Sequence, residues 1–137
     1  MGGPSPLRLL LDTHIFLWAL LEPERLGAAV AAALTDAGNQ LWLSPVSIWE
    51  VLVLADKGRV LLEPDPIAWV RRALRAAPLR EAPLTHEVAI RSRQVELPHA
   101  DPADRFLVAT AQVYELTLVT ADRRLLGLRG VGLLPGS

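Results

Sequence analysis

Apolar residues follow two alternating patterns along this chain. Short runs that are almost continuously apolar are typical of strands buried inside a sheet. Longer stretches between them carry apolar residues at helical spacing, and several open with Asp, Thr or Pro. The short runs predict strands at Leu7–Leu11, Gln40–Leu43, Leu79–Pro83, Leu116–Thr120 and Val131–Leu134.

The longer stretches predict helices at Asp12–Leu21, Glu22–Gly38, Pro45–Lys57, Asp65–Ala76, Thr85–Val95, Asp101–Glu115 and Asp122–Leu128. Pro102 lies in the first turn of its helix, where the missing N–H of proline is tolerated. Strands that alternate with helices predict an α/β domain with a parallel sheet. The 137 residues suffice for one core, and we expect a single domain over residues 1–137.

Composition narrows the classes of protein to which the chain can belong. It has no cysteine, which excludes thiol catalysis, zinc–thiolate sites and disulfide bonds. Its apolar runs are shorter than the roughly 18 residues of a membrane helix, and its first residues lack the pattern of a signal peptide. We therefore expect a cytoplasmic protein without membrane association.

The net charge of −1 argues against nucleic-acid binding by bulk attraction alone. Of the 14 basic residues, however, all but Lys57 are arginine, and several are clustered. Arginine forks bind phosphate better than lysine does, although solvated helix faces explain such clusters equally well.

Two aspartates closely follow predicted strands. Asp12 has apolar residues before and after it, with no lysine or arginine within three positions, and Asp122 follows the last residues of another strand. A buried unpaired carboxylate is costly, so such a group needs a cap, a cation or a metal. Helix capping is the ordinary alternative for each of them.

Two further acids lie on apolar helix faces. Glu50 shares its face with Val46, Val53 and Leu54, and the alternative is that it leans into solvent or pairs with an arginine. Asp104 shares the apolar face of its own predicted helix. It also lies three residues after Asp101, which we expect to be a plain N-cap, so a capping box is the alternative for Asp104.

Ligands of parallel α/β sheets bind beyond the carboxyl ends of the strands. If the strands concerned are neighbours, one cleft could hold Asp12, Glu50, Asp104 and Asp122. Four close carboxylates need a compensating cation, and a set of oxygen ligands favours Mg²⁺ or Mn²⁺. Such a site can activate water for attack on a phosphodiester.

Four segments, in this order and at this spacing, resemble the PIN-domain ribonucleases, and among them the toxin subunits of VapBC-type toxin–antitoxin pairs. They are LLLDTHIFLW, SPVSIWEV, HADPADRFLVATA and LVTADRRL, and they span Leu9 to Leu125. Ala103, within DPADR, replaces an aromatic residue of the family subgroup and leaves the preferred substrate open.

The resemblance implies a PIN-like three-layer α/β/α fold with a central, mostly parallel sheet of about five strands. It also implies a homodimer that cleaves RNA with Mg²⁺ or Mn²⁺, and a small VapB-like antitoxin that blocks the cleft. The acidic quartet of the family carries over to the predicted catalytic residues and metal ligands, Asp12, Glu50, Asp104 and Asp122.

Other residues have supporting roles in this interpretation. Thr13 and Thr120 are expected to hydrogen-bond a carboxylate or metal-bound water. Arg105, Arg123 and His99 are candidate substrate contacts, although each could instead bond only to its neighbours.

Other families fit less well. A phosphatase of the haloacid dehalogenase type needs Asp-x-Asp, and His14 stands at the second position. From a different class, a catalytically inactive PIN-fold subunit that binds only an antitoxin is the alternative to a ribonuclease. The presence of all four acids favours the ribonuclease.

Overall fold

The computed structural model describes residues 6–97, 101–128 and 130–136. Its five strands form one sheet in the order β3-β2-β1-β4-β5, and every neighbouring pair is parallel. This confirms the predicted α/β fold with a parallel sheet. The strands are β1 (Arg8–Leu11), β2 (Gln40–Leu43), β3 (Leu79–Glu81), β4 (Thr117–Thr120) and β5 (Gly132–Pro135).

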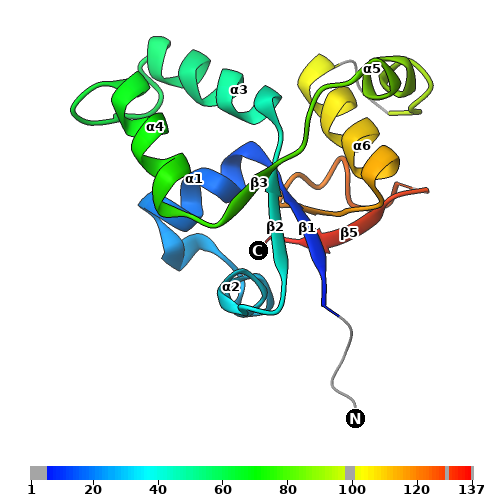
Figure 1. Ribbon diagram of the computed structural model, residues 1–137, viewed down its shortest axis with the longest axis horizontal. Helices are drawn as coiled ribbons and strands as arrows, with labels where there is room; N and C mark the ends of the chain where they lie inside the picture. The colour runs from blue at the N-terminus through cyan, green and yellow to red at the C-terminus, as the bar shows by residue number, and fades with distance from the viewer. Residues whose placement is uncertain (1–5, 98–100, 129, 137) are drawn as a thin grey trace.

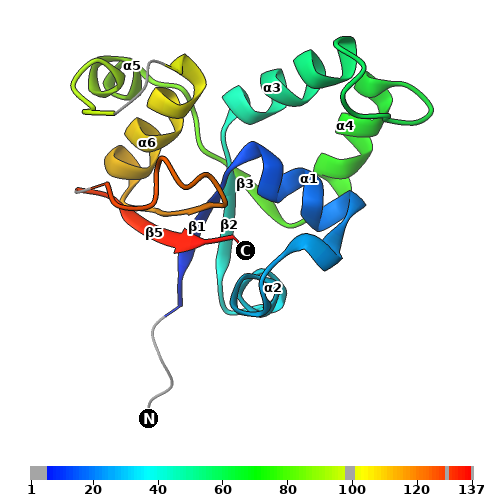
Figure 2. The ribbon, with the colours of Figure 1, turned by 180° about the vertical axis from the view of Figure 1, so that it is seen from behind.

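Helices cover both faces of the sheet and make three layers (Figure 1). One face carries α1 (Thr13–Leu21), α2 (Ala28–Thr35), α3 (Pro45–Asp56) and α4 (Pro66–Ala76). The other face carries α5 (His86–Ser92) and α6 (Pro102–Tyr114), and the view from behind shows the same two groups (Figure 2). Over the described ranges, no helix has the length and apolar character needed to cross a membrane.

The central strand β1 divides its side chains between two cores. Leu9 and Leu11 belong to the cluster that contains Phe16 and Val51 from α1 and α3. Leu10 belongs to the cluster that contains Leu107 from α6. Because successive side chains of a strand point to opposite faces, a strand covered on both faces is apolar throughout. This explains the continuous apolar run that precedes Asp12.

Two of the predicted helices are wrong. The segment 22–38 is not one helix, because a 3₁₀ turn, η1 (Pro23–Arg25), precedes α2. Between them Gly27 is extended, and its N–H donates to the carbonyl of Gly136 at 2.9 Å. The segment 122–128 forms hydrogen-bonded turns, since the Asp122 carboxylate accepts from the N–H of Arg124 and starts a tight turn. Other element ends differ from the predictions by a few residues.

The strand order brings the acidic segments together. Since β1 lies between β2 and β4, the carboxyl ends of all three strands meet at one edge of the sheet. Asp12 follows β1, and Asp122 closely follows β4. The helix that carries Glu50 starts directly after β2 and Ser44. The sequence left open whether these three strands are neighbours, and the structure shows that they are.

Candidate metal centre

A pocket of about 310 Å³ lies at this edge of the sheet. All four acids predicted as ligands line it, together with a fifth acid, Asp101, and one arginine. The lining residues are Asp12, His14, Trp18, Glu50, Asp101, Asp104, Ala121, Asp122 and Arg124. We refer to it below as the acidic pocket.

Asp12 is a buried carboxylate with a buried hydroxyl partner. Its side chain is 8% exposed, and Thr120 at the end of β4 is 0% exposed. The Thr120 hydroxyl donates to Asp12 Oδ2 at 2.6 Å. Burial raises the pKa of the Asp12 carboxyl, and the Thr120 hydrogen bond only partly opposes this. Asp12 is the N-cap residue of α1 and, within the described residues, makes no capping hydrogen bond of ordinary geometry, although the backbone N–H groups of Thr13 and His14 also lower its pKa.

Glu50 is half-buried on α3 and also has a threonine partner. The Thr13 hydroxyl donates to Glu50 Oε1 at 2.5 Å and lies 3.0 Å from the hydroxyl of the buried Ser47. Burial raises the pKa of Glu50, and the charges of Asp12, Asp101 and Asp104 raise it further. Each of the two threonines that we expected to support a carboxylate therefore makes such a hydrogen bond.

Asp101 and Asp104 lie near the start of α6 and make different contacts. Asp101 is the N-cap residue, and its Oδ1 accepts from the N–H of Ala103 at 2.9 Å and of Asp104 at 3.4 Å. The expectation that Asp101 caps this helix is confirmed. Asp104 is buried, as its place on the apolar face predicted, and it faces the pocket.

Asp122 is held by Arg124, a residue that the sequence analysis did not single out. Arg124 Nε lies 3.1 Å from Asp122 Oδ1, and Nη2 lies 2.8 Å from Oδ2. The same Nη2 is 3.8 Å from Asp104 Oδ2. The sequence shows two adjacent arginines here, and only the geometry of the turn selects Arg124 over Arg123.

The acidic pocket offers the oxygen donors that Mg²⁺ and Mn²⁺ prefer. Two of its carboxyls have pKa values raised by burial, so their ionised forms lack sufficient compensation in the metal-free fold. Over the described residues, however, no three His, Asp or Glu side chains already form a group that could hold an ion. The donor set fits a hard divalent cation.

The three predicted substrate contacts lie in different places. Arg105 Nη1 donates to the carbonyls of Val95 at 2.8 Å and Ser92 at 3.4 Å, which joins α6 to the end of α5. Arg123 is exposed on the turn after β4 and is not among the residues that line the pocket. His99 lies outside the described residues.

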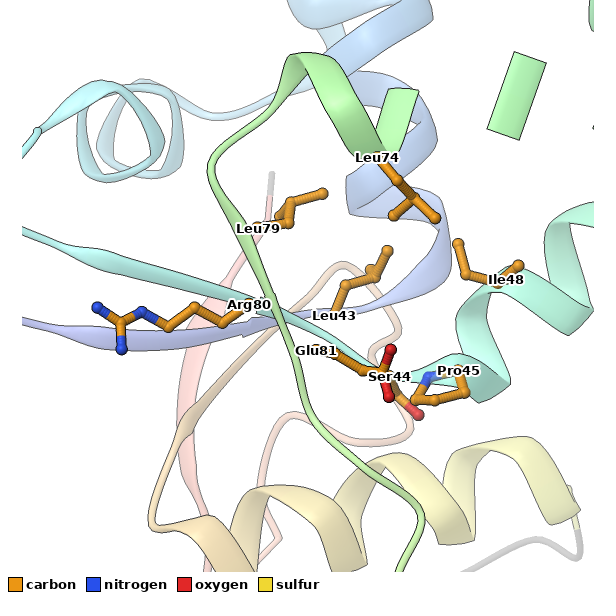
Figure 3. Close-up of a pocket in the computed structure, with 8 residues that line it drawn as sticks. All are labelled: Leu43, Ser44, Pro45, Ile48, Leu74, Leu79, Arg80 and Glu81. Atoms are coloured by element: carbon orange, nitrogen blue, oxygen red, sulfur yellow. The ribbon is translucent and has the colours of Figure 1, made fainter. Parts of the chain in front are cut away.

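A second pocket, of about 400 Å³, lies between α3, α4 and β3 and has a different chemical character. Leu43, Ile48, Leu74 and Leu79 converge in it, and the side chain of Arg80 points away from them (Figure 3). Glu81 is the one acidic residue in its described lining. An apolar pocket of this kind does not suit a cation, so the candidate metal centre is the acidic pocket.

Known proteins resemble this chain in both sequence and structure. The family description "PIN domain" matches residues 9–130. Ribonuclease VapC22 of Mycobacterium tuberculosis (strain ATCC 25618 / H37Rv) is 36% identical over 120 residues, which cover 85% of this chain and 88% of that protein.

Solved structures of toxin–antitoxin complexes share the fold. VapBC2 from Rickettsia felis, bound to a promoter DNA fragment, matches with a TM-score of 0.72 at 13% identity and covers 96% of this chain and 100% of its own. DNA-bound VapBC from Salmonella typhimurium has a TM-score of 0.71 at 18% identity, over 94% and 98% of the two chains. At these identities the likeness shows the fold alone. From the match over residues 9–130 and from the VapC22 relative, this chain belongs to the PIN-domain family.

Proposed function

We propose that this protein is a divalent-metal-dependent endoribonuclease and the toxin component of a toxin–antitoxin pair. The observation that carries the proposal is the acidic pocket, where Asp12, Glu50, Asp104 and Asp122 line one cavity at the carboxyl ends of parallel strands. The 36% identical relative is named a ribonuclease, which supports RNA as the substrate.

The proposed ligands of the cation, Mg²⁺ or Mn²⁺, are Asp12, Glu50 and Asp104, and Asp122 completes the cluster. When bound, a divalent cation polarises a phosphoryl oxygen and makes water a stronger nucleophile. Thr120 and Thr13 orient the carboxylates, since each hydroxyl donates to one of them at 2.6 Å and 2.5 Å, respectively. Locked carboxylate rotamers favour a fixed cation position, which in-line attack on a phosphodiester requires.

We also propose a small antitoxin of the VapB kind as a partner, and a homodimer as the working form. The neighbouring structures are of VapBC complexes, which supports the antitoxin. The protein would act in the cytoplasm, where RNA is present in quantity. Arg105, Arg123 and His99 stay predicted substrate contacts.

The test is cleavage of total cellular RNA by purified protein that has been freed of antitoxin, in Mn²⁺ or Mg²⁺. Asp104→Asn removes one proposed ligand. Asp101→Asn is its matched control, because it removes the same charge from the same pocket while asparagine caps a helix as well as aspartate does. We expect discrete fragments from the wild type and Asp101→Asn, and none from Asp104→Asn or with EDTA.

Two outcomes would contradict the proposal. Cleavage that persists in EDTA would exclude a metal-dependent reaction. Mn²⁺ binding without cleavage of any cellular RNA would favour the alternative, an inactive subunit that retains only the antitoxin contact. The ends of the fragments would identify the RNA and the sequence that is cut.

A further inference from the structure

Among the described residues, Arg124 makes the most extensive ionic contact of the acidic pocket. Its guanidinium forms a bidentate interaction with the Asp122 carboxylate, with Nε 3.1 Å from Oδ1 and Nη2 2.8 Å from Oδ2. Its backbone N–H donates to the same Oδ1 at 2.9 Å. Three donors from one residue therefore hold both oxygens of a proposed metal ligand.

The same guanidinium reaches across to a second element. Nη2 lies 3.8 Å from Oδ2 of Asp104, whose side chain is 10% exposed on α6. The bond to Asp122, together with the charges of Asp122, Asp104 and Asp101, raises the pKa of Arg124. Arg124 is thus the positive partner of two acids that come from different parts of the chain.

Of the described residues that line the acidic pocket, five are acidic and Arg124 alone is a lysine or arginine. The acids are also not gathered into a metal-binding group within the described residues. Among the described residues, Asp122 and Asp104 share one cation that belongs to the protein, Arg124.

An ordinary surface ion pair would explain the two hydrogen bonds from Arg124 to Asp122, but not its 3.8 Å approach to Asp104. Exposed pairs contribute little to stability, and the Arg124 side chain is 57% exposed. Because Arg124 lines a pocket of acidic residues, it has a different effect: its positive charge opposes the entry of a second cation. Its exposure also means that it can leave by side-chain rotation alone.

We propose that Arg124 is an internal counter-cation that shields Asp122 and Asp104 in the metal-free protein and competes with the divalent cation for Asp104. This rests on the proposed function, since it assumes that the acidic pocket binds a metal. The competition sets a metal concentration below which Arg124, and not a divalent cation, compensates the charge of Asp104.

The test is the affinity for Mn²⁺, measured by calorimetry and by the electron paramagnetic resonance signal of free Mn²⁺. Arg124→Gln removes the charge and the bidentate interaction, and Arg124→Lys keeps a charge without the bidentate interaction. Arg123→Gln is the matched control, because the same charge is lost from the neighbouring exposed residue of the same turn. Asp104→Asn verifies that Mn²⁺ binds in this pocket.

We expect Arg124→Gln to bind Mn²⁺ up to about 30-fold more tightly than the wild type, which corresponds to a single charge and a divalent cation about 4 Å apart in a water-like dielectric. Arg124→Lys should lie between them, and Arg123→Gln should stay close to the wild type. Mn²⁺ binding by Arg124→Gln but not by the wild type would support the same conclusion.

Failure of this inference is distinguishable from failure of the proposed function. Equal Mn²⁺ affinities for Arg124→Gln and Arg123→Gln, or weaker binding by Arg124→Gln, would overturn the role of Arg124 and leave the metal site intact. If neither the wild type nor Arg124→Gln binds Mn²⁺, or if Asp104→Asn binds it unchanged, both proposals fall.

Discussion

The two sides of the acidic pocket are built in opposite ways. Asp12 and Glu50 form the hydroxyl side, where each carboxylate accepts from a buried threonine and has a pKa raised by burial. Asp122 forms the ion-pair side, where an exposed turn supplies its own arginine. The first arrangement leaves charge uncompensated in the fold, whereas the second compensates it locally. The need for an added cation is therefore concentrated on the hydroxyl side.

The largest expected difference between the two sides is in metal binding. Asp12→Asn should weaken Mn²⁺ binding by more than about 100-fold and abolish RNA cleavage, since loss of even an outer partner of a ligand costs about 10–100-fold. Asp122→Asn should weaken binding by about 10-fold or less, because Arg124 already occupies both oxygens of Asp122. Calorimetric titration with Mn²⁺ measures both. Equal losses would place Asp122 among the ligands of the same ion.

The next largest effect is the loss of stability when the buried hydroxyl of Thr120, on the hydroxyl side, is removed. Thr120→Val keeps the shape of the side chain but leaves the buried Asp12 carboxylate without its 2.6 Å hydrogen bond and the Asp122 N–H without its 3.0 Å acceptor. The free energy of unfolding should fall by about 1–3 kcal/mol, as for other buried groups left without a partner. Denaturant titration measures this. Thr117→Val, on the same strand, is the control, and an equal effect of both variants would contradict a special role for Thr120.

More of the hydroxyl side could be predicted from the sequence, although the roles of its two threonines came from the family resemblance. Asp12 ends a strand that is apolar throughout, because β1 is buried on both faces, and a carboxylate at such a point is conspicuous. Thr120 ends the neighbouring strand in the same way. Regular elements fix the positions of these residues, so the pattern of apolar residues places each at a strand end. Only the strand order, which the sequence left open, brings the two together.

The ion-pair side could not be predicted in the same way. The sequence favoured a helix from Asp122, yet the Asp122 carboxylate bonds to the N–H of Arg124 and begins a turn instead. Whether Arg123 or Arg124 meets the carboxylates depends on that turn, and a run of two identical residues carries no signal for the choice. A similar local effect, the extended backbone at Gly27, interrupts the predicted helix 22–38.

A smaller effect is the change in Tm in the absence of metal, and we expect its sign to differ between the two sides. In EDTA, Asp12→Asn should raise the Tm by about 3 °C, since a neutral amide removes a poorly compensated buried charge and still accepts from Thr120. Asp122→Asn should lower the Tm, because Arg124 loses its ion pair. Differential scanning calorimetry of both variants provides the measurement. Shifts of the same sign would mean that the two sides do not differ in charge compensation.

The smallest effect is the dependence of stability on pH. The pKa of Glu50 is raised in the fold, so over the interval between its usual and its raised value the folded protein binds more protons than the unfolded chain. The contribution of Glu50 to the free energy of unfolding therefore falls as the pH rises through that interval. Glu50→Gln, which cannot ionise and can still accept from Thr13, should be more stable than the wild type in EDTA at neutral pH and lose this advantage on acidification.

Mn²⁺ should reverse the order of these two proteins at neutral pH, because the cation binds the ionised carboxylate and stabilises only the folded wild type. Glu24→Gln removes the same charge from an exposed position and controls for the change in net charge. Denaturant titrations across the pH range, with and without Mn²⁺, separate these contributions. If Glu50→Gln instead gained its advantage at acid pH, burial would not dominate the pKa of Glu50. The hydroxyl side would then be compensated within the fold, as the ion-pair side is, and the difference between the two sides would disappear.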